Sequence, residues 1–386
     1  MPEAVIVDAV RSPIGRAFKG SLAQLRPDET AAYVVDRLLE RNPDVAPETI
    51  EDVICGCGMP QGLQAFNVGR IIALLSERLP ETVNGVTVSR YCASSLDAIR
   101  HCANAVKAGE GDAYVAAGVE WVSRYNERTE PAGVADQNEL LQGKDGTPNA
   151  YIEMGLTAVN VADRYEVSRA DMDKYAQRSQ ELAVASQEDG YFDREIVPVA
   201  DAEGNEVAKD DGPRASSTLE KLAELPEAFG GGGITAGNSC PLNDGAAAVL
   251  VMSDTRAKEL GLAPRARILS AATWGNEPEY MGVAPIGAIK KVLERTGMSI
   301  SDIDVVELNE AFAAQVIPIM DECEIPLDKL NTHGGAIALG HPFGMTGARI
   351  MTTLLNAMET DDHAVGLETM CVAGGQGEAM VVERLS

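Results

Sequence analysis

Short apolar segments rich in β-branched residues alternate with amphipathic helical segments, first near the start of the chain and again near its end. Amphipathic spacing predicts helices over 29–41 and 93–108, the second followed by Gly109, a residue favoured at a C-terminal cap. Strands alternating with helices indicate an α/β fold whose sheet is covered on both faces. Four segments of the first third have the length and composition of buried strands: 4–9, 50–57, 86–90 and 113–119.

The last third repeats this rhythm, which predicts an internal duplication. Its expected strands and helices are 266–272, 285–297, 304–309, 345–359, 364–370 and 378–384. Between the two thirds lies a polar, Gly- and Pro-rich tract, interrupted by a helical stretch over 155–189 and by 244–252, which we interpret as a helix start leading into a strand. Long insertions commonly carry binding loops. We therefore divide the chain into an N-terminal half (1–120), a loop domain that also holds the last strand of that half (121–250) and a C-terminal half (251–386).

The charge of the chain limits its partners. The 386 residues include 59 acidic and 32 basic side chains, a net charge of −27, which argues against nucleic-acid binding. Only 10 of the basic residues are lysine. Concentrated salt screens the self-repulsion of such a surface. The excess of acid and the scarcity of lysine favour a protein from a halophile over an ordinary acidic cytosolic protein.

The cysteines and the apolar segments predict the cellular compartment of the protein. Seven cysteines, an odd number without a C-x-x-C pair, fit free thiols in a reducing compartment. We interpret Cys55 and Cys57 as packing residues on a strand. No signal peptide precedes the first strand, and no apolar run approaches the ~20 residues of a membrane span. We expect a soluble cytoplasmic protein with no membrane partner.

Cys92 lies in VSRYCASSLDAIR, where a strand gives way to a helix. The free amides and the positive end of the dipole at a helix N-terminus favour a thiolate, so we expect a lowered pKa and a nucleophilic sulfur. This local pattern alone leaves a buried structural cysteine equally open.

Three segments of the last third each carry one more reactive side chain, at a strand end or in a glycine-rich turn: Asn309 in VELNEAFA, His341 in NTHGGAIALGHPFG and Cys371 in MCVAGGQG. Glycines allow backbone amides to approach a ligand closely. A cysteine with a histidine indicates acyl transfer, and a second cysteine suits carbon–carbon bond formation. Simpler readings are a structural turn for His341 and a cap on the following helix for Asn309, the latter compatible with a catalytic role.

Taken in order, these segments resemble the thiolase family, and the similarity extends from the opening VIVDAVRSPIGRAFKGSLA through TAGNSCPLNDGAAA to the C-terminus. The resemblance implies two duplicated α/β halves in a five-layered α-β-α-β-α arrangement with an inserted loop domain over coenzyme A. It also implies a homodimer or homotetramer. Coenzyme A and acyl-CoA would be substrates, with no bound cofactor and no metal.

The resemblance also implies roles for the reactive residues in ping-pong cleavage of a 3-ketoacyl-CoA, or in the reverse condensation. Cys92 matches the nucleophile that accepts the acyl group, and His341 matches its base, which also helps to form an oxyanion hole. Asn309 matches the residue that holds a water in that hole. Cys371 matches the second acid/base.

Further positions match residues around the substrate. Arg214 corresponds to a basic residue near the CoA nucleotide, while Met154 and Met281 correspond to methionines near the acyl group, although a core role suits both. Ala373 replaces a glycine whose amide lines a second oxyanion hole. The remaining expected contacts to substrate are Ala236, Ser239, Cys240 and Phe312. Three places depart from the common family pattern: CASS, Glu153 and Cys240–Pro241. The chain length of the acyl group in the substrate therefore stays open.

Three other functions compete with a thiolase. A ketoacyl synthase of the same superfamily would use one cysteine with two histidines and lack Asn309 and Cys371. A non-catalytic thiolase-like lipid carrier would be expected to lose one of the four reactive residues, and all four are present. An acidic structural module would explain the charge but not the glycine-rich segments.

Overall fold

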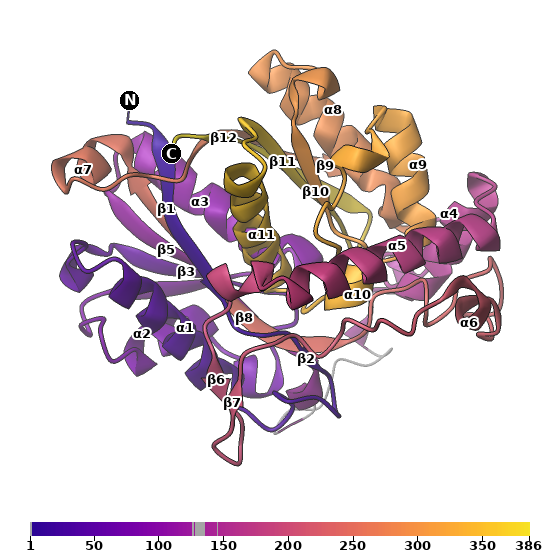
Figure 1. Cartoon of the computed structure of the whole chain (residues 1–386), viewed down its shortest axis with the longest axis horizontal. Helices are drawn as coiled ribbons and strands as arrows, with labels where there is room; N and C mark the ends of the chain where they lie inside the picture. Colours follow the sequence, from indigo (N-terminus) through magenta and orange to yellow (C-terminus); the bar gives the residue numbers. More distant parts are fainter. Residues whose placement is uncertain (1, 126, 128–135, 145) are drawn as a thin grey trace.

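The framework of the protein is one large mixed sheet (Figure 1). The computed structural model describes residues 2–125, 127, 136–144 and 146–386. From one edge of the sheet to the other, the strands are β4 (Asn84–Val88), β3 (Asp52–Cys57), β5 (Ala113–Trp121), β8 (Asn243–Ser253), β1 (Ala4–Arg11), β9 (Ala266–Gly275), β12 (Gln376–Arg384), β11 (Val365–Val372) and β10 (Val305–Leu308). The short β2 (Gly15–Arg16) pairs with β8, and β6 (Val199–Ala200) pairs with β7 (Glu206–Val207) elsewhere.

The pairing pattern confirms the predicted duplication. In the first half β3 is parallel to β5, and β8 lies antiparallel between β5 and β1. In the second half β10 is parallel to β11, and β12 lies antiparallel between β11 and β9. A short antiparallel contact between β1 and β9, through Val5 and Ile6, joins the two halves into one sheet.

Helices complete the five layers. Three buried hydrophobic clusters fill the space between these layers. Successive residues of β1 point to opposite faces of the sheet, so Val5 belongs to one cluster and Ile6 to another. Helices α1 (Pro27–Arg41) and α2 (Val68–Leu75) cover the outer face of the first half, whereas α8 (Ala284–Thr296) and α9 (Ala313–Cys323) cover that of the second. Between the halves lie α3 (Ser94–Ala108) and α11 (Thr346–Thr360).

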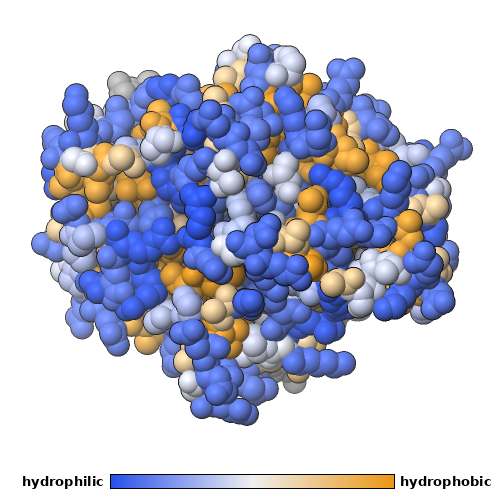
Figure 2. Space-filling view, viewed as in Figure 1, coloured by the Kyte–Doolittle hydropathy of each residue, from blue (hydrophilic) through white to orange (hydrophobic). Residues whose placement is uncertain are grey.

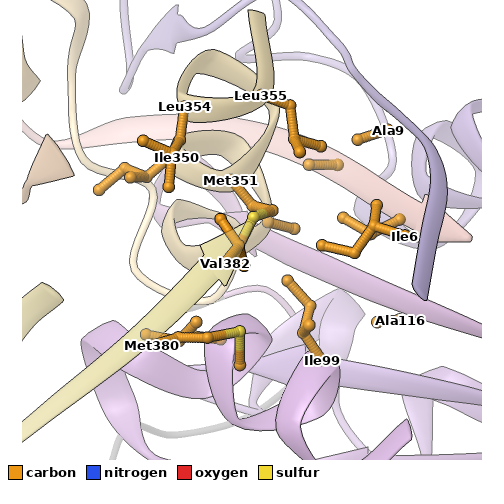
Figure 3. Close-up of a cluster of buried hydrophobic side chains, with 14 of the residues drawn as sticks. Ile6, Ala9, Ile99, Ala116, Ile350, Met351, Leu354, Leu355, Met380 and Val382 are labelled. Atoms are coloured by element: carbon orange, nitrogen blue, oxygen red, sulfur yellow. The ribbon is translucent and has the colours of Figure 1, made fainter. Parts of the chain in front are cut away.

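The central layer is almost entirely aliphatic (Figure 3). Ile99 of α3 and Met351 of α11 pack there with Ile6 of β1 and Val382 of β12. Gly109 ends α3 in the left-handed conformation with φ 76°, as its position predicts. Small and branched side chains allow two helices and two sheet halves to approach closely without aromatic bulk.

The tract between β5 and β8 differs from the sequence prediction in two places. The stretch 155–189 is two helices, α4 (Met154–Arg164) and α5 (Arg169–Glu188), because Ser168 caps α5 and Glu166 has a positive φ of 53°. The expected helix start within 244–252 is wrong. The whole run is β8, an interior strand hydrogen-bonded on one side to β1 and on the other to β5, and these two ladders outweigh local helix propensity.

Three shorter helices remain: α6 (Leu219–Ala223), α7 (Asp254–Glu259) and α10 (Ala336–Leu339). Helix α5 runs along one side of the molecule beside α9 and α10 (Figure 1). All seven cysteines are free, and Cys55 and Cys57 are packing residues in the cluster under α1 and α2. Throughout the described residues, no helix is both long enough and apolar enough to span a bilayer.

Candidate active site

Cys92 lies at the predicted strand-to-helix junction. A 3₁₀ turn, Tyr91–Ala93, connects the end of β4 to α3, and Tyr91 has a positive φ of 42°. The Ser94 hydroxyl accepts a hydrogen bond from the Arg90 amide at 2.9 Å and donates one to the Tyr91 carbonyl at 2.6 Å. These bonds hold a tight turn that directs Cys92 inward, where only 8% of the residue is exposed.

The N-termini of the two central helices meet at the site. Ala348, near the start of α11, donates its backbone N–H to the Ser95 hydroxyl at 2.8 Å. A Cβ on Gly347 would collide with the backbone of Leu96, and one on Gly344 would collide with the Val119 carbonyl. The glycines that follow His341 therefore allow α11 to begin directly against α3. The duplication places the Cys92 turn and the His341 segment side by side.

His341 is held in one tautomer. Its Nδ1 lies 2.6 Å from the Thr346 hydroxyl, and that hydroxyl donates its single proton to the Pro342 carbonyl at 2.8 Å. Thr346 must therefore accept from His341, which places the imidazole proton on Nδ1. Nε2 keeps its lone pair and lies 3.2 Å from Asn309 Nδ2. Burial, with a further contribution from Arg349, lowers the pKa of His341 to about 3, so the imidazole is neutral at physiological pH.

Asn309 follows the last residue of β10, and its backbone N–H bonds to the Thr369 carbonyl at 3.0 Å. It does not cap the next helix, because Phe312 is the N-cap residue of α9 and no side chain caps that end. Its Nδ2 faces His341, while its buried Oδ1 has no hydrogen-bond partner among the described protein atoms. A buried acceptor without a partner is expected to bind water or ligand.

Cys371 lies on β11 and is fully buried. Burial raises its pKa to about 11, an effect opposed by a hydrogen bond from the side chain of Gln315. The turn that carries Cys92 packs against β11, which carries Cys371, and Cys371 acts electrostatically on Cys92. Sequence reasoning missed Gln315 and Thr346, although each lies within six residues of a residue that it identified.

The prediction of a lowered pKa for Cys92 is wrong. Burial raises the pKa of this thiol well above its usual range, and the nearby Cys371 raises it further. The backbone amide of Ala373 opposes the shift but does not reverse it. The loss of hydration in a nearly closed site outweighs the dipole of the helix N-terminus. Cys92 is therefore a neutral thiol at rest and requires a base.

Basic side chains line a pocket of about 240 Å³ in the tract between β5 and β8. Arg214 and Lys221 provide its positive charge, and Ala236 and Pro241 are on its wall. The structure thus brings Arg214 and Ala236 together, as expected for neighbouring contacts to one ligand. In a protein with a net charge of −27, two adjacent cations create a local attraction for an anion.

A backbone ladder connects this pocket to the buried thiols. Cys240 donates its N–H to the Ala311 carbonyl at 3.0 Å, and Ser239 forms a bridge with Phe312. Cys371 acts electrostatically on Cys240, and Cys240 in turn acts on Cys92. The segment that follows Ala236 therefore runs from the basic pocket to Cys92 and Cys371.

Apolar side chains surround the second thiol. The hydrophobic cluster that contains Cys371 also contains Met281 and Phe312, with the partly buried Met154 and Cys240 packed against it. The two methionines therefore have the core role considered above, and they are also part of the apolar surroundings of the site. The residues expected around an acyl group thus belong to one cluster.

The fold and the site define a class: duplicated five-layer α/β proteins with two neighbouring buried cysteines and a neutral histidine where two central helices begin. Models of the thiolase N-terminal and C-terminal domains match residues 4–255 and 262–384. The chain belongs to the thiolase family.

Relatives and a solved structure agree with this membership over the full length. The chain is 42% identical to a 3-oxoadipyl-CoA/3-oxo-5,6-dehydrosuberyl-CoA thiolase of Escherichia coli K12, with 100% of both chains covered. It is also 42% identical to a 3-ketoacyl-CoA thiolase of a Marinomonas species, covering 99% of this chain and 98% of the relative. The crystal structure of the Bacillus anthracis acetyl-CoA acetyltransferase aligns with a TM-score of 0.91 and 38% identity, covering 100% of this chain and 99% of that one.

Proposed function

We propose that this protein cleaves 3-ketoacyl-CoA with free coenzyme A, and catalyses the reverse Claisen condensation, by ping-pong transfer through an acyl group on Cys92. One observation carries the proposal: Cys92 and Cys371 are neighbouring neutral thiols, beside a neutral imidazole whose Nε2 carries a lone pair and faces Asn309. A base, a nucleophile and a second proton donor are thus together in a water-poor site, as this reaction requires.

The first half-reaction opens the carbon–carbon bond. His341 Nε2 takes the Cys92 proton, and the thiolate attacks the 3-keto carbon. The C2–C3 bond breaks, its electron pair goes to C2 of the departing acetyl-CoA, and Cys371 protonates that carbon. Asn309 and the protonated His341 face the developing oxyanion, where preorganised donors supply much of the acceleration in such reactions.

The second half-reaction restores the enzyme. Coenzyme A gives its thiol proton to the Cys371 thiolate and attacks the acyl-Cys92 thioester. The Cys92–acyl bond breaks, acyl-CoA leaves, and Cys92 regains its proton from His341. Each proton and electron pair is returned within the cycle, and the steps need coenzyme A only as a substrate.

The basic pocket is the proposed site for the phosphates of CoA. We assign it to the loop domain (121–250), which supplies Arg214 and Lys221. The pantetheine arm would then follow Ser239 and Cys240 towards the thiols. The related proteins act on 3-ketoacyl-CoA, 3-oxoadipyl-CoA or acetyl-CoA according to their names, so we propose short 3-ketoacyl-CoAs, including acetoacetyl-CoA, as substrates.

The test is CoA-dependent loss of acetoacetyl-CoA, followed with wild-type protein and with Cys92→Ser. We expect turnover with the wild type, and its loss in the variant with CoA affinity nearly unchanged. Cys371→Ala should slow condensation far more than acylation of Cys92. Full activity of Cys92→Ser would exclude the proposed nucleophile, and folded wild type inactive on both short and longer 3-ketoacyl-CoAs would exclude the proposed reaction.

We also propose that the protein forms a homodimer or homotetramer through the β4 edge of the sheet. Strand β4 pairs with β3 on one side, and its other edge has no strand partner in the described part of the chain. Val86 on this strand and Leu74 and Leu75 on the adjoining α2 are substantially exposed. An unpaired edge flanked by apolar side chains favours pairing with a second copy. Light scattering after size exclusion that gave a monomer at micromolar concentration would contradict this assembly.

Finally, we propose that this is a cytoplasmic protein of a halophile. Its net charge of −27 with 10 lysines supports adaptation to salt, and its seven free cysteines support a reducing compartment. Arginine supplies most ion pairs among the described residues, such as Arg194 and Arg265 with Glu359. The salt dependence of the stability of the protein tests the proposed adaptation to salt.

A further inference from the structure

Gln315 touches the second thiol with both atoms of its amide. Its Nε2 lies 3.0 Å from Cys371 Sγ, and its Oε1 lies 3.2 Å from the same sulfur. Nε2 also lies 3.4 Å from the backbone carbonyl of Asn309. The residue is fully buried in the first turn of α9, 56 positions from Cys371 in the chain. The amide therefore contacts two segments that carry reactive side chains.

The surrounding backbone keeps this amide in place. The Gln315 N–H bonds to the Phe312 carbonyl at 3.1 Å, which fixes the first turn of α9. On the other side Gly282, in the 3₁₀ segment Pro278–Val283, leaves room for the glutamine. A Cβ there would lie 3.0 Å from Gln315 Cβ and 3.5 Å from its Oε1. A methyl group at position 282 would thus push directly on the side chain that holds Cys371.

The two cysteines have different hydrogen-bonding partners. Cys92 has the backbone amide of Ala373, whereas Cys371 has a side-chain amide that can both donate and accept. As a thiol, Cys371 can donate its S–H to Oε1. As a thiolate, it loses that bond but keeps the N–H of Nε2, which becomes a stronger, charge-assisted bond. One fixed side chain can therefore serve both protonation states without moving.

We propose that Gln315 is a positioning residue that enables Cys371, rather than Cys92, to alternate between thiol and thiolate during proton transfer at the substrate α-carbon. The inference rests on the proposed thiolase reaction and deepens it. Cys371 must give and take a proton in each cycle inside a site where an unpaired charge is costly. Gln315 reduces this cost at Cys371, whereas Cys92, the acyl carrier, has the backbone amide of Ala373 and no side-chain donor among the described residues.

The test separates the two half-reactions of acetyl-CoA in Gln315→Leu and Gln315→Glu. Acetylation of Cys92 is followed by mass spectrometry of the intact protein, and α-proton exchange by loss of the methyl signal of acetyl-CoA in D₂O. We expect acylation of Cys92 to slow much less than exchange in both variants, because the departing CoA thiolate depends less on a proton from Cys371 than the α-carbon does. Exchange should fall by roughly 10²–10⁴-fold, the usual value of a positioned acid/base.

The pH profile gives a second readout that a purely structural defect would not produce. Without the Nε2 donor the thiolate of Cys371 is less stable, so the rise of exchange with pH should move upward by roughly 1 to 2 pH units in Gln315→Leu. Glutamate at this position adds a negative charge beside the sulfur, so its profile should move at least as far. Gly282→Ala should move the pH profile of exchange in the same direction, by a smaller amount.

Ile319→Val provides the matched control, because it alters a fully buried side chain one turn further along the same helix that cannot hydrogen-bond to Cys371. It should retain both acylation and exchange. Equal loss of acylation and exchange in the folded Gln315 variants, or unchanged exchange, would overturn the inference. If Gln315→Leu does not fold, Gln315→Glu and Gly282→Ala decide the matter by the same criteria. Wild-type protein that neither acylates nor exchanges would instead refute the proposed thiolase reaction.

Discussion

The three titratable side chains of the site, Cys92, Cys371 and His341, are all shifted towards their neutral forms by burial. The pKa values of the two thiols rise, that of Cys371 to about 11, and the pKa of His341 falls to about 3. The resting site therefore carries no charge on these groups at neutral pH. Charge separation between Cys92 and His341 becomes favourable only when substrate supplies an electrophile and its own polar groups. This arrangement protects the buried thiols from reacting in the absence of substrate.

The His341 shift predicts how stability depends on pH. The pKa falls from an ordinary 6.5 to about 3, so between these values the unfolded chain binds a proton that the native protein does not. The contribution of His341 to the free energy of unfolding is fully present above pH 6.5. It is lost as pH falls towards 3, by up to about 1.4 kcal/mol per pH unit. In His341→Asn, the loss of stability between pH 7 and pH 5 should be smaller by about 2 kcal/mol, since about 1.5 of these pH units lie below 6.5. Denaturant unfolding of both proteins measures the difference, and parallel pH dependences would contradict the assignment.

At the scale of elements, a buried ion pair joins β1 to the segment that carries Arg214. The Arg11 guanidinium donates to both oxygens of Asp210, at 2.8 and 2.9 Å, and lies 3.3 Å from Glu195. Asp210 also accepts the backbone N–H of Ile14 at 2.7 Å. A Cβ on Gly212 would collide with the Ala338 carbonyl, so the segment is also confined on its opposite side. The wall of the basic pocket is thereby fixed to both halves of the fold.

Removing the carboxylate should therefore affect both stability and substrate binding. Asp210→Ala leaves the buried Arg11 without its bidentate partner and is expected to cost about 3–5 kcal/mol. The KM for CoA should rise more than kcat falls, because Arg214 is only four residues away. Glu203→Gln removes one exposed carboxylate of the same tract, so it should change stability by less than about 0.5 kcal/mol. Thermal or denaturant unfolding at one salt concentration compares the three proteins, and equal stabilities would show that the pair contributes nothing.

At the scale of the whole molecule, an aliphatic core is enclosed by a strongly acidic surface. Figure 2 shows hydrophilic side chains over most of one face, with apolar groups confined to small areas. Aromatic residues make up only 4% of the chain, so close packing of small side chains supplies the burial. A net charge of −27 adds self-repulsion that the core must overcome.

Salt should therefore stabilise the protein. The screening length falls from about 10 Å at 0.1 M salt to about 3 Å at 1 M, so repulsion between surface carboxylates weakens over this range. We expect Tm to rise by several degrees from dilute buffer to concentrated KCl, with thiolysis increasing in parallel. NaCl at equal ionic strength should give a similar rise if screening is the cause. A Tm that does not depend on salt would refute adaptation to a saline cytoplasm.

Features that arise from local spacing along the chain were predictable before the structure was known. Alternating strands and helices predicted the duplicated sheet, because the hydrophobic period and the length of each segment can be read within that segment alone. Glycine-dense segments identified His341 and Cys371, because close backbone packing leaves a local signature, and a strand end identified Asn309. The strand-to-helix junction at Cys92 was visible for the same reason.

Properties that depend on residues distant in the chain required the folded structure. The run 244–252 is a strand because β1 and β5 bond to it from both sides. The pKa of Cys92 is raised because the folded protein removes water from a helix terminus that would otherwise favour a thiolate. Gln315 meets Cys371 only after α9 packs against β11. Hydration, electrostatics and hydrogen-bond partners are set by neighbours in space, and a local sequence pattern does not contain those neighbours.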